Sequence, residues 1–487
     1  MKSKWYLGLL AIFTMGMLTS CSGLQTTPCV TNCGGGGSGT ANVSLTLFDT
    51  PPTGALFLNF NLPVASMSLT PSGGSADVPL LSTPTTYEAT HLQSDSALVG
   101  TFSVASGTYT ALNIFITNSP SSVWFNGSAS TILGCTPVSI CNLSGGAPGK
   151  ISIDLTTAIG GAGLVLTANQ NIGLGIDFNL NNLITTTNGI SIDWTQPNVF
   201  TLVSLPRVGQ ATGTLDTLQN FTGIVTAVNS GSITVKSSFQ GTQTFPINSN
   251  TTYTEVPNLP NQCSGGASFS CIAVNSTVSV DAVINTNTTL TATNVDIIRT
   301  AAVDEVEGTI FPTTTPGQLG MVVSDSIIVS GNTPAVALNP GTTILLTPAS
   351  SPLYVIDSKN FPTVNAGLFA GTGDLLSGQV VRAQIQSSSV STLLNVVASS
   401  VILRFATITG TVGTTTPTSS VFYLDNLTLN RFYGSFVTQP QVQTYSPQTI
   451  IDGVANINSL TAGRSVSISA LYLNGVPPFV ATKVRQH

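Results

Sequence analysis

Apolar and polar residues alternate along most of the chain after residue 41. Segments such as Val43–Leu47, Ile151–Leu155 and Ile233–Val235 place an apolar residue at every second position. This period of two, rich in Val, Ile and Thr and interrupted by Gly, Pro and Asn, predicts half-buried β-strands. No capped segment with helical spacing appears over a convincing length after the first twenty residues. The pattern therefore predicts an all-β protein.

The C-terminal half repeats four landmarks in the same order three times. Each repeat begins with a strand whose glycine lies two residues before Val or Ile; these glycines are Gly223, Gly308 and Gly410. A second apolar strand, an alternating strand with an alanine and a closing Ala-x-x-Val strand follow, with an arginine near each close: Arg299, Arg404 and Arg485. The order predicts three homologous domains, each a small β-barrel or sandwich, at residues 211–300, 303–405 and 406–487.

Residues 42–206 lack these landmarks and contain many short predicted strands with turn signals, which favours a β-sandwich. Three motifs carry a resemblance here: Val43–Pro52, Ala105–Leu112 and Gly175–Leu180. They resemble a domain of unknown function found in bacterial surface lipoproteins, although Asp-Thr-Pro replaces Asp-Ala-Pro and Ala105-Ser106 replaces Pro-Ala. Asp49–Pro52 is interpreted as a turn at the end of the first strand.

The three repeats resemble a second uncharacterised domain of bacterial extracytoplasmic proteins. Its pattern is Gly-x-Val, a strand, Val-Gly-Asp-x-Val-x-Val and a closing strand. Leu460–Ile468 fits best, with Arg464 in place of the aspartate. Neither family has an established activity, so the two resemblances imply a fold and a location, not a reaction.

Residues 1–20 have the pattern of a secretory leader. Lys2 and Lys4 precede an uncharged, mostly apolar run from Trp5 to Met17, which is too short to span a bilayer. Leu18–Cys21 resembles the lipobox of bacterial lipoproteins, which implies a diacylglycerol group on Cys21; an ordinary leader with a chance cysteine is the alternative. By the same resemblance, Ser22 favours the outer membrane. Residues 21–41, with four consecutive glycines, are predicted to form a tether.

Charged residues make up only 7% of the chain, against roughly 25% in ordinary soluble proteins. Ser, Thr, Asn and Gly take their place, which is typical of secreted β-rich proteins and argues against a cytoplasmic enzyme. The net charge is −6, and Lys and Arg occur singly. A nucleic-acid interface needs a basic stripe, so we do not expect nucleic acid as a partner.

Six cysteines besides Cys21 form three close pairs in the sequence: Cys29 with Cys33, Cys135 with Cys141, and Cys263 with Cys271. Paired cysteines in an exported chain predict disulfides. The alternative is a metal site, which would need Cys-x-x-Cys spacing or nearby histidines, and the sequence has neither. We therefore expect neither a metal nor a cofactor.

Residues suited to catalysis are few. His91 is the only histidine placed to serve a Ser-His-Asp triad, and without a Gly-x-Ser-x-Gly motif it is interpreted as a loop residue. His487 is the last residue and is expected to be disordered. Glu305 and Glu307 share one face of a predicted strand, where we interpret them as charges that protect an exposed edge. Surface calcium and carboxylate-pair catalysis are the alternatives.

Trp124 and Trp194 are candidates for ligand contact, because flat rings stack on the apolar faces of sugars. The alternative for both is packing in the core or a loop. The leading hypothesis is a lipid-anchored, non-catalytic array of β domains, arranged as a stalk, with a structural, adhesive or binding role at the envelope. Capture of polysaccharide is the second hypothesis, and a hydrolase is the third. Besides the membrane, we expect polysaccharide or envelope and surface proteins as partners, with the body facing either the periplasm or the cell surface.

Overall fold

The computed structural model describes residues 39–487, apart from residues 54, 127–129, 133, 138, 186–189, 239, 261, 314–317, 332–333, 335–336, 360, 363, 390–394 and 428–438. The predicted leader, lipidated Cys21 and most of the tether therefore lie outside the described residues. Strands dominate, so the prediction of an all-β protein is confirmed. Within the described ranges, no helix has the length and apolar character needed to cross a membrane.

The N-terminal unit comprises the first fifteen strands and three single-turn helices. The strands are β1 (Thr40–Thr50), β2 (Leu56–Val64), β3 (Ser66–Pro71), β4 (Val78–Pro79), β5 (Thr85–Glu88), β6 (Ala97–Ala105), β7 (Gly107–Ile116), β8 (Ser121–Asn126), β9 (Ser139–Ser144), β10 (Gly149–Asp154), β11 (Leu164–Leu166), β12 (Asn171–Asn179), β13 (Ile184–Thr185), β14 (Ser191–Ile192) and β15 (Phe200–Leu205). The helices are α1 (Ala89–Leu92), α2 (Leu155–Ala158) and α3 (Leu180–Leu183).

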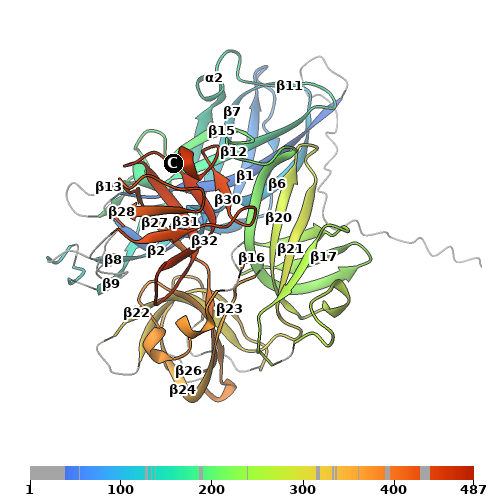
Figure 1. Ribbon diagram of the computed structural model, residues 1–487. Coiled ribbons are helices and arrows are strands. Elements are labelled where there is room, and N and C mark those ends of the chain that lie inside the picture. Colours follow the sequence, from blue (N-terminus) through green and yellow to red (C-terminus); the bar gives the residue numbers. More distant parts are fainter. Residues whose placement is uncertain are drawn as a thin grey trace, which may run out of the picture.

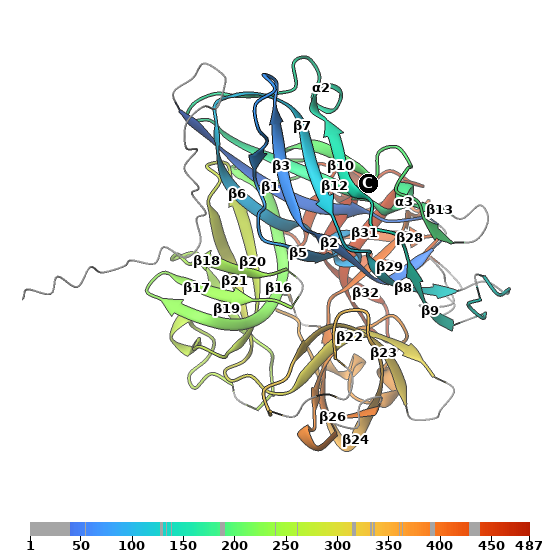
Figure 2. The same cartoon turned by 180° about the vertical axis from the view of Figure 1, so that it is seen from behind.

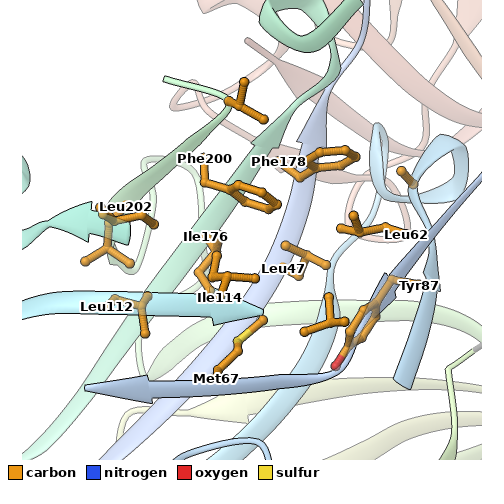
Figure 3. Packing of buried hydrophobic residues seen from close by; sticks show 14 of the residues in the cluster. Leu47, Leu62, Met67, Tyr87, Leu112, Ile114, Ile176, Phe178, Phe200 and Leu202 are labelled. Carbon is orange, nitrogen blue, oxygen red and sulfur yellow. The ribbon is translucent and has the colours of Figure 1, made fainter. Parts of the chain in front are cut away.

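The core of this unit lies between two sheets, one ordered β15-β12-β1-β6 and the other β10-β7-β3-β4. Leu47 of β1 and Ile176 of β12 meet Ile114 of β7 there, and all three are fully buried (Figure 3). The opposite face of β1 is also buried: Ser44 and Thr46 alternate with the core residues and are 0% exposed. A strand covered on both faces must lie between the core and another part of the molecule.

Three further sheets follow, and they fall within the ranges of the three sequence repeats. Repeat 1 contains β16 (Thr214–Asn229), β17 (Ser232–Lys236), β18 (Thr242–Pro246), β19 (Thr252–Glu255), β20 (Thr277–Asn285) and β21 (Leu290–Arg299). Repeat 2 contains β22 (Glu305–Pro312), β23 (Leu319–Ile327), β24 (Thr343–Ile356), β25 (Val380–Ile385) and β26 (Asn395–Arg404). Repeat 3 contains β27 (Ala406–Val412), β28 (Val421–Asp425), β29 (Gln441–Gln443), β30 (Ile450–Asp452), β31 (Ser465–Tyr472) and β32 (Phe479–Gln486). Five 3₁₀ turns connect them: Phe269–Cys271, Ala366–Leu368, Thr372–Asp374, Ser387–Ser389 and Ile457–Ser459.

The three repeats share one strand arrangement and one register. The glycine of the first strand pairs with a valine in each: Gly223 with Val278, Gly308 with Val381 and Gly410 with Val466. In each repeat the closing strand also pairs with a parallel strand; these pairs are β19–β21, β24–β26 and β30–β32. Repeat 2 forms a closed five-stranded barrel, whereas repeats 1 and 3 are six-stranded sheets.

Close packing of the neighbouring strand explains why the first strand of each repeat has a glycine at this position. A Cβ atom on Gly223 would lie 2.2 Å from the Lys236 carbonyl oxygen, and one on Gly308 would lie 2.2 Å from the Val322 carbonyl oxygen. On Gly410 the corresponding distance, to the Asp425 oxygen, is 2.8 Å. The neighbouring strand approaches too closely for any side chain, so only glycine fits this position of the repeat.

The prediction of a stalk with its units in line is wrong, because the units pack around one another (Figures 1 and 2). Repeat 3 lies beside the N-terminal unit, and both views place repeat 2 at the opposite end of the molecule from α2. Leu58 and Phe125 of the N-terminal unit share an apolar cluster with Phe422 of repeat 3. Repeats 1 and 2 share another, which includes Ile298 and Ile402. These shared clusters would be exposed to water in an extended array.

Two of the three predicted disulfides lie in the described part of the chain, and both are formed. Cys135 is bonded to Cys141, and Cys263 is bonded to Cys271. Each closes a short loop, so the bridges fix loops locally and do not join the units to one another.

The structure does not describe the residues of the third predicted disulfide, between Cys29 and Cys33. Cys29 and Cys33 both precede residue 39, where the described chain begins, and so lie outside the described residues. The bond between Cys29 and Cys33 therefore stays a prediction from the sequence.

Candidate functional site

The last strand of the chain carries two cations that are buried against the N-terminal unit. Lys483 and Arg485 of β32 are 0% and 2% exposed. Alternate residues of a strand share a face, so both side chains point the same way. That face lies against the segment Leu92–Ser96, which connects α1 to β6. Buried cations are tolerated only with good partners, so the surroundings of these two define a candidate site.

Lys483 and Arg485 find those partners in the N-terminal unit and in repeat 1. Lys483 Nζ donates to Asp95 Oδ1 at 2.9 Å and to the Thr217 carbonyl oxygen at 3.1 Å. Arg485 Nη1 donates to the Leu92 carbonyl oxygen at 2.9 Å, and Arg485 Nη2 donates to Ser96 Oγ at 2.9 Å. The two cations therefore connect three units that are far apart in the sequence.

Arg207 joins the same cluster from the segment between the N-terminal unit and repeat 1. Its Nε and Nη2 atoms donate to the two oxygens of Asp452 at 2.9 and 2.8 Å, and Nη2 also lies 3.1 Å from Asp216 Oδ1. Arg485 Nε donates to the same Asp452 at 2.8 Å. Both guanidinium groups lie over the ring of Phe48, at 4.3 Å from its centroid for Arg207 and 5.2 Å for Arg485. We call this cluster the N-terminal junction; it consists of Asp95, Arg207, Asp216, Asp452, Lys483 and Arg485.

The cations decide the ionisation of the two best-paired carboxylates. Burial by itself would raise the pKa of Asp452, but Arg485 and Arg207 lower it well below its usual range. For Asp95, too, burial opposes ionisation, while the charge of Lys483 and the contact with His91 lower the pKa overall. Both groups are therefore anions at neutral pH, and the ion pairs of the junction are intact there.

Both histidines of the chain lie at this junction. His91 Nε2 is 3.4 Å from Asp95 Oδ2; burial lowers the pKa of His91, but Asp95, Glu88 and Glu307 raise it overall. His487 is ordered, and the expectation of a disordered C-terminal residue is wrong. Its backbone N–H donates to the Ser465 carbonyl oxygen at 3.0 Å, and burial together with Arg485 lowers its pKa to about 3.

A buried carboxylate, Asp49, and a partly buried one, Asp177, occur at the ends of β1 and β12. Burial, and then the charge of Asp177, raise the pKa of Asp49, while burial raises the pKa of Asp177 to about 6. Asp49 is paired with Phe178, and Asp177 with Phe48, in the register of these parallel strands. Paired residues of neighbouring strands share a face, so the two carboxylates leave the sheet on opposite faces. They do not form a facing pair of the kind that glycosidase chemistry requires.

A second cluster of buried charges joins repeats 1 and 2. Arg299 and Arg382 both contact Glu305, and Arg382 Nε also donates to Glu307 Oε2 at 2.8 Å. Arg404 lies 3.4 Å from Glu307, contacts Asp357 and donates to Thr222 Oγ1 at 3.1 Å. Arg382 also contacts Asp325. We call this cluster the repeat junction; it consists of Arg299, Glu305, Glu307, Asp325, Asp357, Arg382 and Arg404.

Glu305 and Glu307 therefore do not have the role that we predicted. We expected two charges on an exposed edge strand, but β22 is a strand of a closed barrel, paired on both sides with β23 and β25, and its Glu305 is 0% exposed. The adjacent Asp304 accepts hydrogen bonds from the backbone of Val329 and Ser330 at 2.8 and 3.0 Å. The acidic run is a set of partners for buried arginines and backbone N–H groups, and the pattern of charges alone could not distinguish this from a solvated edge.

A cavity of about 100 Å³ lies where residues of all four units meet. Its charged lining residues are Glu88, His91, Glu307 and Arg404, and its polar residues include Gln93 and Thr222. Glu88 Oε1 accepts from Phe60 N at 2.9 Å, and Glu88 Oε2 accepts from His91 N at 2.9 Å, so this carboxylate is engaged in capping α1. A space of this volume is large enough for a few water molecules. In the described residues, no group of three or more His, Cys, Asp or Glu side chains could hold a metal ion.

The two predicted ligand-contact tryptophans lie elsewhere. Trp124 is 2% exposed and belongs to the core of the N-terminal unit, which favours the packing alternative for this residue. Trp194 is partly exposed; its ring stacks on Phe178 at a centroid distance of 6.2 Å, and its Nε1 donates to the Gly146 carbonyl oxygen at 2.9 Å. Neither lines the central cavity.

Sequence reasoning missed most of the residues in both junctions. It singled out Glu305 and Glu307, although with another role, and the arginine at the close of each repeat. All three of these arginines are buried in the junctions. Their partners differ. Arg485 pairs with Asp452 of β30, and Arg404 pairs with Asp357, the residue that follows β24. Arg299 instead pairs with Glu305 of the next repeat. Asp95, Asp216 and Lys483 have no pattern in the sequence that sets them apart.

Comparison with known proteins assigns one segment of the chain. Residues 222–296, within repeat 1, match the model of a family described as a domain of unknown function, DUF5666. No curated protein matches the chain. One solved structure, described as "drosophila Unr CSD456", matches at 8% identity over 55% of this chain and 97% of that chain; its TM-score of 0.12 carries no argument about the fold.

Proposed function

We propose that this chain is a lipid-anchored protein of the bacterial cell envelope, held in the outer membrane, whose β units serve a structural, adhesive or binding role without catalysis. The observation that carries the proposal is where the few charged side chains lie: several of the cations are in the two junctions between the β units. In a chain with only 7% charged residues, five Lys and Arg side chains are buried in ion pairs of the two junctions, and a sixth, Arg207, is only 13% exposed there. The charges hold the β units in one body.

Such a body suits a structural or binding role. Removing one partner from a buried ion pair costs about 3–5 kcal/mol, so relative movement of the units is strongly opposed. A rigid body loses little conformational entropy when a partner binds to its surface, which favours a binding role. The formed bridges Cys135–Cys141 and Cys263–Cys271 support an oxidising compartment outside the cytoplasm.

The anchor is tested by substituting Cys21. Full-length chain with Cys21→Ser should move from the membrane fraction to the soluble fraction of cells, because the thioether bond to lipid can no longer form. The double variant that carries Cys29→Ser and Cys33→Ser is the matched control, since it removes two nearby cysteines and keeps the lipobox. If Cys21→Ser stays in the outer membrane as the control does, the lipid anchor is refuted.

The side of the membrane that the body faces is tested by treating intact cells with protease. Release of peptides from residues 211–487 would place the body at the cell surface and support an adhesive or capture role. If these peptides appear only after the outer membrane is breached, the body is periplasmic. The adhesive role would then be excluded, leaving a structural role inside the envelope.

Carbohydrate binding is the second candidate, and a specific surface feature favours it. A groove of about 480 Å³ is lined by uncharged amide and hydroxyl side chains: Thr53, Asn181, Asn182, Thr185, Gln196 and Asn198. Such groups match the hydroxyl groups of a sugar, and partly exposed Trp194 lies two residues from Gln196 along the chain. Purified surface polysaccharide should bind the parent protein at least tenfold more tightly than Asn181→Ala. Asn142→Ala, an exposed amide on β9, is the control and should bind like the parent.

A further inference from the structure

The described chain begins at an end of the N-terminal unit where three segments meet. The Gly39 carbonyl oxygen accepts from Ser106 N at 2.9 Å, and the Thr40 carbonyl oxygen accepts from Asn169 N at 2.7 Å. Strand β11 pairs with the start of β7 beside them, with Leu166 opposite Gly107. Figure 1 places β11 and α2 together at this end. The described chain therefore begins beside the turn that follows β11, one short strand away from the α2–β11 loop.

This end exposes apolar side chains, and Asp154, the exposed N-cap of α2, is a charged residue beside them. Ile159 is 41% exposed and Val165 is 53% exposed. The loop between them contains three glycines with positive φ, so its backbone turns tightly at the tip. The sequence has no Asp, Glu, Lys or Arg in the three segments that meet here: residues 39–48, 101–116 and 155–170.

The length of the tether sets how far this end stands from a lipid attached to Cys21. Eighteen residues, 22–39, separate Cys21 from Thr40. Even fully extended, a segment of that length reaches at most about 60 Å, so this end stays within that distance of the lipid. An apolar side chain gains free energy when it moves from water to the boundary between headgroups and acyl chains, and a loop without charge has no ion to desolvate on approach.

We propose that the end bearing Ile159 and Val165 rests on the lipid bilayer, with these two side chains inserted at the boundary between headgroups and acyl chains. The proposal rests on the lipid anchor at Cys21. It fixes the orientation of the whole body: repeat 2, at the opposite end in both views, points away from the membrane (Figures 1 and 2). Repeat 2 is then the part most accessible to a partner or a protease.

The test uses mature full-length protein purified from cells and reconstituted in phosphatidylethanolamine/phosphatidylglycerol vesicles with brominated acyl chains. Val165→Trp places a fluorophore on the proposed contact. Val329→Trp in repeat 2 is the matched control, because Val329 is 51% exposed and lies beyond β23. Emission from Val165→Trp should be quenched at least twofold more than that from Val329→Trp, after subtraction of the signal from the parent protein.

The introduced tryptophan could itself cause insertion into the bilayer. Hydrogen exchange of the unsubstituted protein therefore tests the membrane contact without it. Amides of residues 159–166 should exchange several-fold more slowly on vesicles than in detergent, with no change around Val329. Mass spectrometry of Cys21 separates the two ways in which the proposal can fail. An unmodified Cys21 overturns the anchor and, with it, this orientation. A lipidated Cys21 with equal quenching at both positions and unchanged exchange overturns the membrane contact and leaves the anchor intact.

Discussion

Lys483, on the last strand of the chain, donates to Asp95 of the N-terminal unit at 2.9 Å, across 388 positions of sequence. Lys483 is 0% exposed and Asp95 is 2% exposed. The pair closes the polypeptide on itself: the C-terminal repeat cannot leave the N-terminal unit without exposing both partners. The contact explains how a chain built from successive β units becomes one body.

Breaking this pair should destabilise the protein. Lys483→Met leaves the Asp95 carboxylate buried without its main cation, so the free energy of unfolding should fall by about 3–5 kcal/mol. Lys236→Met, on the exposed end of β17, is the control and should change it by less than about 0.5 kcal/mol. Urea unfolding followed by circular dichroism measures both. Equal midpoints for the two variants would contradict the structural role of the pair.

Asp177 should make stability depend on pH between about 4 and 6. Its folded pKa of about 6 lies above the unfolded value of 3.8, so the unfolded chain loses its proton first as pH rises. The contribution of Asp177 to stability is therefore greatest below about pH 4 and is lost as pH rises through 6. Asp177→Asn keeps an oxygen for Thr50 Oγ1 and should be more stable than the parent at pH 7.5, by up to about 3 kcal/mol.

The difference between Asp177→Asn and the parent should disappear near pH 3.5, where both side chains are neutral in the folded protein. Denaturant midpoints recorded across this pH range provide the check. A difference that is constant with pH would mean that the amide acts by packing and not by removing a partly buried charge.

His487 should make the protein less stable as pH falls, which is the opposite of the pH dependence expected from Asp177. Its folded pKa of about 3 lies below the ordinary value of 6.5, so the unfolded chain binds a proton first as pH falls. Stability attributable to His487 is present above pH 6.5 and is lost as pH falls towards 3. His487→Gln should therefore flatten the acid side of the stability profile, whereas His91→Gln should not, because the pKa of His91 is raised. Identical profiles for the parent and His487→Gln would refute the assignment.

The repeated glycine should tolerate no side chain. Gly308→Ala forces a Cβ atom to within 2.2 Å of the Val322 carbonyl oxygen, so the two strands must separate, at a cost of about 1–3 kcal/mol or more. Gly223→Ala should behave alike in repeat 1, since its clash with Lys236 has the same length. Gly231→Ala, which meets nothing within 4 Å, is the control. Thermal unfolding should show lower Tm values for the first two variants only.

The sequence carried the information for secondary structure because strand patterns are local. Alternation at Val43–Leu47 predicted the strand and the face that enters the core, and the closeness of Cys135 to Cys141 predicted their bridge. The repeat landmarks included the glycines Gly223, Gly308 and Gly410, and the structure shows that the same steric demand recurs at all three. In each case the physical cause acts within one sheet or one loop.

The sequence alone thus determined that this protein is all-β, where its strands lie and which cysteines are bonded in the described loops. Only the tertiary structure decided that the units pack around one another, that Glu305 faces arginines instead of water, and that Lys483 pairs with Asp95. An isolated charged residue on a strand has the same local pattern whether its face meets solvent or another unit. The burial that separates the two cases comes from contacts between residues hundreds of positions apart, and no local pattern records them.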